Sequence, residues 1–200
     1  MTTFAIEVRG TEDVQKTLRQ LAGREMDRAA SMALNKVAAK ARTEADRAIR
    51  DRFAVASDQV RGSMVLIRAK HNGRNLEAIV QIFGSPTKRG RSMNLVRFLE
   101  RSVTLAQAKK RRKAGTLKQL RFKILKSGGL KTIDGSFLGN NGRTVFRRTG
   151  EDRLPIEPVQ VIGVSQMFNT RVIRSRVLNR VNRELLDEVN RAVALVISRR

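Results

Sequence analysis

Apolar residues recur at helical spacing in two long stretches, one towards each end of the chain. In the first, residues 25–53, most apolar positions are alanine, so this helix can lie close to a neighbouring element. We predict that its apolar stripe packs in the core, with a subunit interface as the alternative. The second stretch begins after Asn169 or Thr170, both good helix-capping residues, and continues to about Ser198. The apolar positions are Met26, Ala30, Ala33, Leu34, Val37, Ala41, Ala45, Ile49 and Phe53 in the first stretch, and Ile173, Val177, Val181, Leu185, Val189, Val193 and Val196 in the second.

Alternating apolar and polar residues predict strands at the N-terminus and between the two long helices. Asn72-Gly73 separates two such stretches and favours a hairpin turn, because both central residues of that turn have positive φ. Two short helices are also expected, one from Thr11 to Leu21 and one that Ser57 caps and that continues to Met64. The predicted strands cover residues 4–8, 65–70, 75–83, 117–125, 144–148 and 159–164, with further turns at Gly128-Gly129 and Asn141-Gly142.

These elements together predict an α+β fold. N-terminal helices and a long C-terminal helix would pack on a mostly antiparallel sheet, with one long basic loop excursion. A chain of 200 residues with 40% hydrophobic residues can bury a core, and we predict a single domain over residues 1–200. Because the chain has eight Phe and neither Trp nor Tyr, that core must be mainly aliphatic.

The formal net charge of +24 is the feature of the composition that says most about function. Charge of one sign destabilises a compact state by self-repulsion, so an anionic partner is expected. Residues 84–148 hold eight Lys and ten Arg against two acids, Glu100 and Asp134, which places two-thirds of the net charge in one segment. Runs of unpaired charge are costly to bury. We therefore predict that residues 84–117 form a basic insertion that is mobile in the free protein.

Two runs of basic residues in this segment are the candidate contacts to the anionic partner. Lys and Arg near phosphates release counterions, which gives DNA affinity that falls with salt and is independent of sequence. The chain has no zinc-finger spacing, compact recognition helix or aromatic-rich RNA-binding sheet, so base-specific recognition is not expected. Genomic double-stranded DNA, bound non-specifically, and an acidic protein surface both stay open as partners. The candidate contacts are Lys88, Arg89, Arg91, Lys109, Lys110, Arg111, Arg112 and Lys113.

Patterns typical of catalysis or metal binding are scarce. His71 adjoins the predicted hairpin turn and is the one histidine of a chain without cysteine, so we expect an exposed turn residue. The carboxylate pairs Glu151-Asp152 and Asp187-Glu188 have basic neighbours and are expected to form solvated ion pairs. The glycine-rich stretches lack the Gly-Lys-Ser/Thr ending of a phosphate-binding loop. We predict a protein that is not an enzyme and that has no cofactor and no metal.

The absence of cysteine excludes disulfides and fits assembly in a reducing cytoplasm. No apolar run nears the roughly 20 residues that a membrane-spanning helix needs, so no membrane partner is expected. The N-terminal residues also lack the basic and then apolar pattern of a secretion signal.

Two motifs, one towards each end, form a more specific pattern. The first is the alanine-rich helix of residues 29–38, which has alanine, apolar, Asn, basic, Val and Ala in that order. The second is Arg153-Leu154-Pro155-Ile156, which follows residues 146–150 and precedes Val164-Ser165-Gln166-Met167-Phe168 and a long charged helix. In these motifs the chain resembles the prophage minor tail protein Z (tail-completion) family of long-tailed phages. The resemblance covers about residues 25–70 and 144–200, without the central basic segment.

This resemblance implies a structural virion protein without catalytic residues. Such a tail-completion or neck subunit would form part of a ring of identical copies around the DNA path and make the tail competent for joining to the head. Its partners would be its own copies and other tail or neck proteins, and its place would be the virion, with the host cytoplasm during assembly. The alternative is a sequence-independent nucleic-acid-binding protein of ribosomal or nucleoid type, which the basic composition would also suit.

Overall fold

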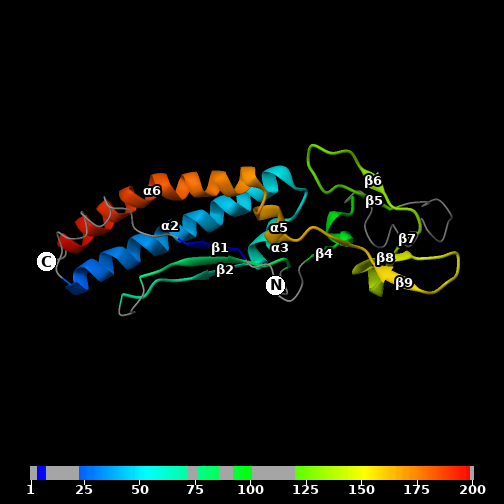
Figure 1. Cartoon of the computed structure of the whole chain (residues 1–200), viewed down its shortest axis with the longest axis horizontal. Helices are drawn as coiled ribbons and strands as arrows, with labels where there is room; N and C mark the ends of the chain where they lie inside the picture. Colours follow the sequence, from blue (N-terminus) through cyan, green and yellow to red (C-terminus); the bar gives the residue numbers. More distant parts are fainter. Residues whose placement is uncertain (1–3, 8–22, 72–75, 86–91, 101–119, 199–200) are drawn as a thin grey trace.

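The structure, a computed structural model, describes residues 4–7, 23–71, 76–85, 92–100 and 120–198. The molecule is elongated, and its two ends differ in content (Figure 1). One end, here called the helical part, holds two long helices and a three-stranded sheet from residues 4–85 and 164–198. The other end, the β-rich part, is built from residues 92–162 and holds short strands and loops.

Two long helices, α2 (Gly23–Arg52) and α6 (Arg171–Ile197), lie side by side and antiparallel. An ion pair joins Lys40 to Glu188 near the middle of the two helices, and another joins Asp51 to Arg176 at one end. All seven apolar positions predicted for α6 are buried. In α2 the predicted positions from Ala30 onward are also buried, and Met26 is half-buried. The prediction of core packing for the first stripe is therefore confirmed, and the apolar face predicted for the second helix is buried as well.

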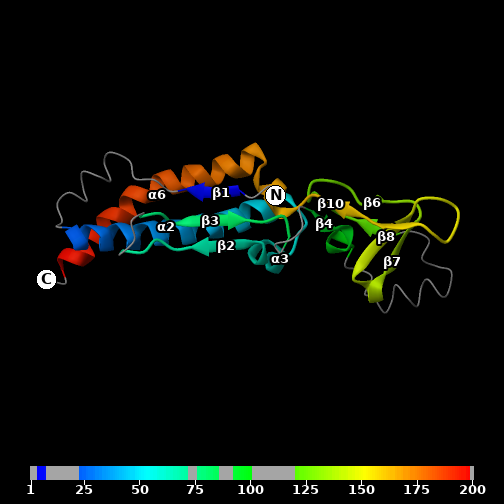
Figure 2. The same cartoon turned by 60° about the horizontal axis from the view of Figure 1, so that its bottom comes forward.

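A three-stranded antiparallel sheet lies against α2 (Figure 2). Its order is β1-β3-β2, with β1 at Phe4–Glu7, β2 at Met64–Ile67 and β3 at Ile79–Ile82. In the register of the sheet, Ile82 of the central strand lies between Phe4 and Met64 of its neighbours. The predicted antiparallel pairing of the two stretches around residues 65–83 is confirmed, although both strands are shorter than predicted.

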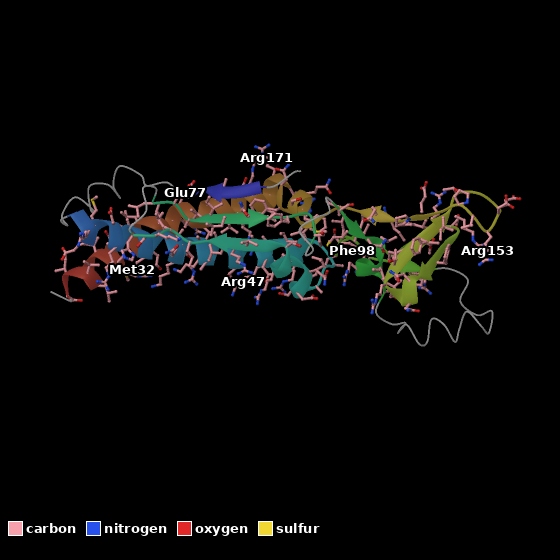
Figure 3. The ribbon with its side chains drawn as sticks, turned by 90° about the horizontal axis from the view of Figure 1, so that it is seen from below. Met32, Arg47, Glu77, Phe98, Arg153 and Arg171 are labelled. Carbon is pink, nitrogen blue, oxygen red and sulfur yellow. The ribbon has the colours of Figure 1, made fainter. Side chains whose placement is uncertain are left out.

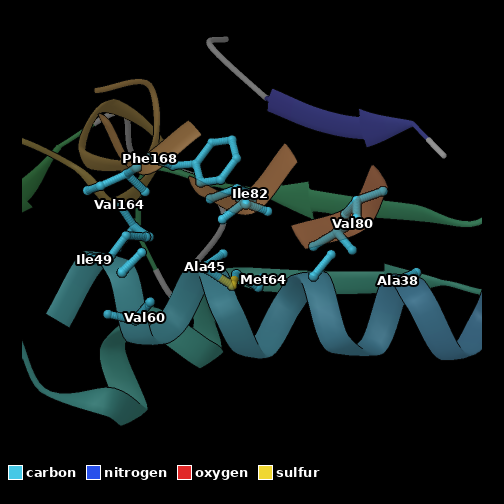
Figure 4. Close-up of a cluster of buried hydrophobic side chains, with 14 of the residues drawn as sticks. Ala38, Ala45, Ile49, Val60, Met64, Val80, Ile82, Val164 and Phe168 are labelled. Carbon is cyan, nitrogen blue, oxygen red and sulfur yellow. The ribbon is translucent and has the colours of Figure 1, made fainter. Parts of the chain in front are cut away.

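The core of the helical part lies between α2 and the sheet. Ala38 and Ala45 have no bulk beyond Cβ, so the helix approaches the strands closely, and Val80 and Ile82 are fully buried against it (Figure 4). Phe168 adds an aromatic ring here, and Phe53, Phe98 and Phe122 are the other aromatic residues buried in the same core. The mainly aliphatic core expected from the composition is therefore present, and alanine is what lets α2 pack between the sheet and α6.

Two short helices, α3 (Ser57–Gly62) and α5 (Val164–Phe168), lie where the helical part meets the β-rich part. Val164 donates a backbone hydrogen bond of 2.9 Å to the carbonyl of Gly84, so the chain leaves the helical part and returns to it at the same place. The Gln166 side chain accepts a hydrogen bond from the Gly163 N–H and so satisfies a free donor before α5.

Among its described residues, the β-rich part has three small antiparallel sheets and two 3₁₀ turns. The largest has the order β7-β8-β9, in which Phe137 pairs with Phe146 and Phe146 with Pro158. The elements are β4 (Met93–Asn94), η1 (Leu95–Phe98), β5 (Arg121–Phe122), β6 (Lys131–Thr132), β7 (Ser136–Gly139), η2 (Asn140–Gly142), β8 (Thr144–Arg148), β9 (Ile156–Pro158) and β10 (Gln160–Val161).

Part of the predicted basic insertion contributes to the core. Met93, Leu95 and Phe98 are each at most 3% exposed, so residues 92–100 belong to the folded unit. The remainder of the segment, residues 86–91 and the part from residue 101, lies outside the described residues. The prediction treated residues 84–117 as one basic segment. It therefore did not distinguish the apolar residues of 92–100 from the basic runs on either side.

Several predicted boundaries were wrong in detail. Val164 begins a helix and does not end a strand, because the chain turns at Gly163 and the Gln166 side chain caps the new helix. Ser57 does not cap α3: Ala56 holds that position, and the Ser57 hydroxyl bonds to Asp46. That helix also stops at Gly62, since the next residues turn into β2.

Other boundaries agree with the structure. The strand predicted at residues 144–148 is β8. The bounds of α2 and α6 fall within about two residues of the predicted ones. The predicted α+β class is confirmed. Asn140 and Asn141 have positive φ at the predicted turn. Of the stretch 117–125, only Arg121–Phe122 forms a strand among the residues described there. The predicted helix at residues 11–21 and the Asn72-Gly73 turn lie outside the described residues.

Candidate interaction surfaces

The eight basic residues predicted as partner contacts all lie outside the described residues. Lys88, Arg89 and Arg91 fall in residues 86–91, and the run from Lys109 to Lys113 falls in residues 101–119. The structure shows where these segments are attached. Residues 86–91 lead from the end of the helical part into β4, and residues 101–119 begin and end within the β-rich part.

The described residues that flank segment 101–119 are joined by backbone hydrogen bonds. The N–H of Glu100 donates to the carbonyl of Arg121 at 3.0 Å, and the N–H of Lys123 donates to Phe98 at 2.9 Å. Leu99 and Phe122 form an antiparallel bridge between these bonds. The Lys109–Lys113 run is therefore carried on a segment whose base is fixed to a buried part of the chain.

A cationic hollow lies beside this base. It has a volume of about 490 Å³, and three cationic side chains line it together with a single carboxylate, Glu100. Glu100 lies 3.9 Å from Arg121, and no ion pair forms at the three cations within the described part of the chain. The lining residues are Ala54, Val55, Arg97, Phe98, Leu99, Glu100, Lys123, Lys126 and Leu130.

The hollow is assembled from three separated segments. Ala54, just after α2, donates a backbone hydrogen bond of 2.8 Å to Ile124, and Lys126 donates one of 2.9 Å to Arg52. The 3₁₀ turn η1 contributes Arg97 and the buried Phe98. These contacts bring cations that are about 30 residues apart in the sequence to one surface.

The Arg153–Ile156 motif forms part of an exposed loop at the far end of the β-rich part, where Figure 3 labels Arg153. This tip loop, residues 149–155, connects β8 to β9. Thr149 closes it by donating hydrogen bonds from both its N–H and its hydroxyl to the Pro155 carbonyl, each at 3.3 Å. Leu154 is 66% exposed, the highest exposure of any large apolar residue among those described.

Acidic side chains of the helical part bind internal cations. Glu188 is 1% exposed and lies 2.6 Å from Lys40, 2.7 Å from Arg191 and 3.2 Å from Lys36. Burial opposes its ionisation, but the hydrogen bonds from Lys40 and Lys36 lower its pKa below the ordinary value. The prediction that Asp187-Glu188 is a solvated pair is wrong for Glu188, because Lys36 and Lys40 reach it from α2.

Asp46 has the same arrangement between α2 and α3. It is 1% exposed, accepts two hydrogen bonds from Arg50 at 3.0 and 2.9 Å, and accepts another from Arg61 at 3.1 Å. Burial opposes the charge, and the two guanidinium groups lower the pKa of Asp46. Glu44 binds Arg176 at 2.6 Å in a third such contact. These acids stabilise the helical part and are not available to a partner.

The remaining candidate chemistry is limited. His71 is exposed in a turn, as predicted. Among the residues that the structure describes, no group of three or more His, Asp or Glu side chains is placed to hold a metal ion. No described helix is long and apolar enough to cross a membrane.

Comparison with known families gives a match over nearly the whole chain. The family model of prophage minor tail protein Z (GPZ) matches residues 8–199. The chain belongs to this family. As a member of the prophage minor tail protein Z family, it is a structural protein of a phage tail, located in the virion tail with other tail proteins as partners. The family is not known for enzyme activity. Neither the curated proteins nor the solved structures gave a match.

The match extends the resemblance to the central basic segment. The charge of that segment is evident from the sequence. The cationic hollow beside the residues that flank it is not. Arg97, Lys123 and Lys126 stand singly in the sequence, and only the pairing of Phe98 with Lys123 brings them together. The acidic residues of the tip loop and Leu154 are adjacent in the sequence, but the exposure of the leucine is set by how β8 and β9 pair.

Proposed function

We propose that this minor tail protein is a tail-completion subunit at the neck, where copies form a ring around the DNA path and make the tail competent for head joining. The observation that carries the proposal is the family match combined with the distribution of charge. Two-thirds of the net charge of +24 lies in residues 84–148. A ring around a polyanion needs such a concentration, whereas a subunit in contact only with protein does not.

The described structure supports this role in two ways. The acids of the helical part are bound to internal cations, so the positive charge of the β-rich part is not neutralised from within. The elongated shape also separates the helical part from the β-rich part (Figure 1). One part can then pack in the tail while the other extends towards the DNA path.

Within this proposal, the basic runs face the DNA lumen. Lys88, Arg89, Arg91 and the Lys109–Lys113 run would contact phosphates without reading bases. The family match favours the tail subunit over a ribosomal or nucleoid protein, because those classes do not account for similarity to a tail protein over residues 8–199.

The test is a stop codon early in the gene, followed by electron microscopy of the lysate. We expect filled heads and full-length tails that fail to join. Normal infectious particles would overturn the proposal and favour the nucleic-acid-binding alternative. A wild-type copy supplied from a plasmid is the control, since it must restore joining if the defect comes from this protein alone.

The DNA contact has a separate test. Replacing the five basic residues Lys109–Lys113 by Gln should leave particles assembled but lower infectivity through poor genome retention or delivery. The control replaces exposed cations of the helical part, such as Arg47, by Gln, so that charge is removed away from the proposed DNA contact. Its infectivity should stay unchanged. Full infectivity of the Lys109–Lys113 variant would show that this run does not act on DNA.

A further inference from the structure

We propose that the tip loop of one copy docks into the cationic hollow of the next copy, and that this head-to-tail contact repeats around the ring. The inference rests on the ring proposed above and names the two surfaces that would meet. It follows from two patches of the described structure that match in charge and in apolar content.

The hollow offers cations over an apolar floor. Arg97 and Lys126 are exposed and Lys123 is half-buried. None of the three forms an ion pair within the described part of the chain, although the Asp58 carboxylate interacts with Arg97 at longer range. Leu130 is 43% exposed, and Phe98 and Leu99 lie beside it. A volume of about 490 Å³ lies within the usual range for sites that enclose a small group, about 300–1,000 Å³. The hollow therefore fits a short segment that carries both carboxylates and an apolar side chain.

The tip loop has this composition. Glu151 and Asp152 are exposed and form no ion pair with the described residues, and Leu154 follows them with 66% of its surface exposed. The hydrogen bonds from Thr149 to Pro155 close the loop, and the ring of Pro155 fixes φ at its end. This closure reduces the backbone entropy that the loop would lose on docking.

Arg153 adds a cation to this loop and finds a counterpart in the same hollow. Glu100 is the single carboxylate among the residues that line it, and its contact to Arg121 at 3.9 Å is long and exposed. Docking would place the two carboxylates of the tip loop against the three cations of the hollow. It would also place Arg153 against Glu100. The two patches are thus complementary in both signs of charge.

The geometry favours a contact between copies. Figure 3 places Phe98, in the wall of the hollow, between the middle of the long axis and the end that carries Arg153. The tip loop and the hollow of one chain are therefore separate patches. A contact between two different patches is heterologous, and it closes into a ring when the rotation between neighbours allows.

A second copy fits the hollow better than DNA does. A duplex would satisfy the cations, but it would also meet Glu100 and leave the exposed Leu130 against a charged backbone. The tip loop offers carboxylates to the cations, Arg153 to Glu100 and Leu154 to Leu130. The DNA-facing role stays with the basic runs of residues 86–91 and 101–119.

Cross-linking tests the contact, since the chain contains no cysteine. Particles that carry both Asp152→Cys and Lys126→Cys are treated with a short bis-maleimide, and the chain is detected by an antibody. We expect a ladder of covalent dimers and higher multimers. The matched control pairs Asp187→Cys, an exposed acid on α6, with Lys126→Cys and should give no ladder. Monomer alone from the Asp152 pair, in particles shown to contain the protein, would overturn the proposal.

Charge exchange gives a second measurement. Asp152→Lys and Lys126→Asp should each lower the yield of joined particles about tenfold, as expected for reversal of an interfacial charge pair, and the double variant should recover most of it. Asp187→Lys is the control for added charge. If Lys126→Asp reduces genome retention and Asp152→Lys does not rescue it, the hollow binds DNA and the proposal fails. The stop-codon phenotype would be unchanged by that failure, so the two proposals can be judged separately.

Discussion

The side-chain amide of Asn35 pairs with the backbone of Ala69 as if it were a strand. Its Nδ2 donates to the Ala69 carbonyl at 3.0 Å, and its Oδ1 accepts from the Ala69 N–H at 2.8 Å. The pair joins α2 to the chain just after β2, where Ala69 is buried. This contact gives a physical reason for the asparagine in the alanine-rich motif of residues 29–38.

Replacing Asn35 by Ala should destabilise the protein by about 1–3 kcal/mol, because the N–H and C=O of Ala69 would both lose their partners. Asn35→Asp should also destabilise, since a carboxylate can accept from the N–H but cannot donate to the C=O. Thermal or urea unfolding measures the change. Equal stability of the Ala variant and the wild type would show that water replaces the amide at no cost.

Glu188→Gln should lower the free energy of unfolding by about 1–3 kcal/mol. A buried carboxylate that binds three cations would be replaced by a neutral group. The loss stays below the roughly 3–5 kcal/mol of a fully buried ion pair, because Lys40 is 35% exposed and the other two cations are more exposed still. The exposed neighbour is the control: Asp187→Asn should change stability by less than about 0.5 kcal/mol. Matching values for the two variants would contradict the anchoring role of Glu188.

Stability should fall as the pH is lowered below about 4. The pKa values of Asp46, Glu184 and Glu188 are all lowered in the folded protein. The unfolded chain therefore binds protons first, so the stabilisation is complete above the ordinary carboxyl pKa and is lost as pH falls through the folded values. Urea midpoints at constant ionic strength measure this effect. Glu188→Gln should show a weaker pH dependence than the wild type, and parallel curves would exclude a contribution from that group.

Gly139→Ala should destabilise the β-rich part by about 1–3 kcal/mol. A Cβ at this position would lie 2.7 Å from Cδ2 of the Phe146 ring, which rests on the glycine. The backbone itself would tolerate Ala, because φ is −120°. Gly129 is the control, since nothing lies within 4 Å of a Cβ there. Thermal unfolding should show a loss for the first variant only. A stable Gly139→Ala protein would mean that the ring moves freely.

Elements with a repeated face were predictable from the sequence, and isolated ones were not. The stripe from Ile173 to Val196 defines α6 because seven apolar positions agree. Val164, a single β-branched residue after a strand, was assigned to that strand, since the cap from Gln166 becomes visible only in three dimensions. The strand β9 at Ile156–Pro158 was missed, because Pro155 and Pro158 cannot donate backbone hydrogen bonds and are typical of loops.

The same limit applies to the candidate surfaces. Lys109–Lys113 stand out in any count of charge, and so they were found. Glu188 was assigned to the solvated surface because its partners Lys36 and Lys40 are about 150 residues away in the sequence. The cationic hollow depends in the same way on long-range pairing and gives no local signal.

The hydrogen bond between Val164 and Gly84 has a consequence for how this family can change over time. The whole β-rich part lies between these two adjoining residues. A segment whose ends already meet can lengthen or shorten without separating those ends, provided that its contacts to Arg52 and Ala54 at the end of α2 are kept. The helical part and the β-rich part can therefore diverge at different rates among relatives.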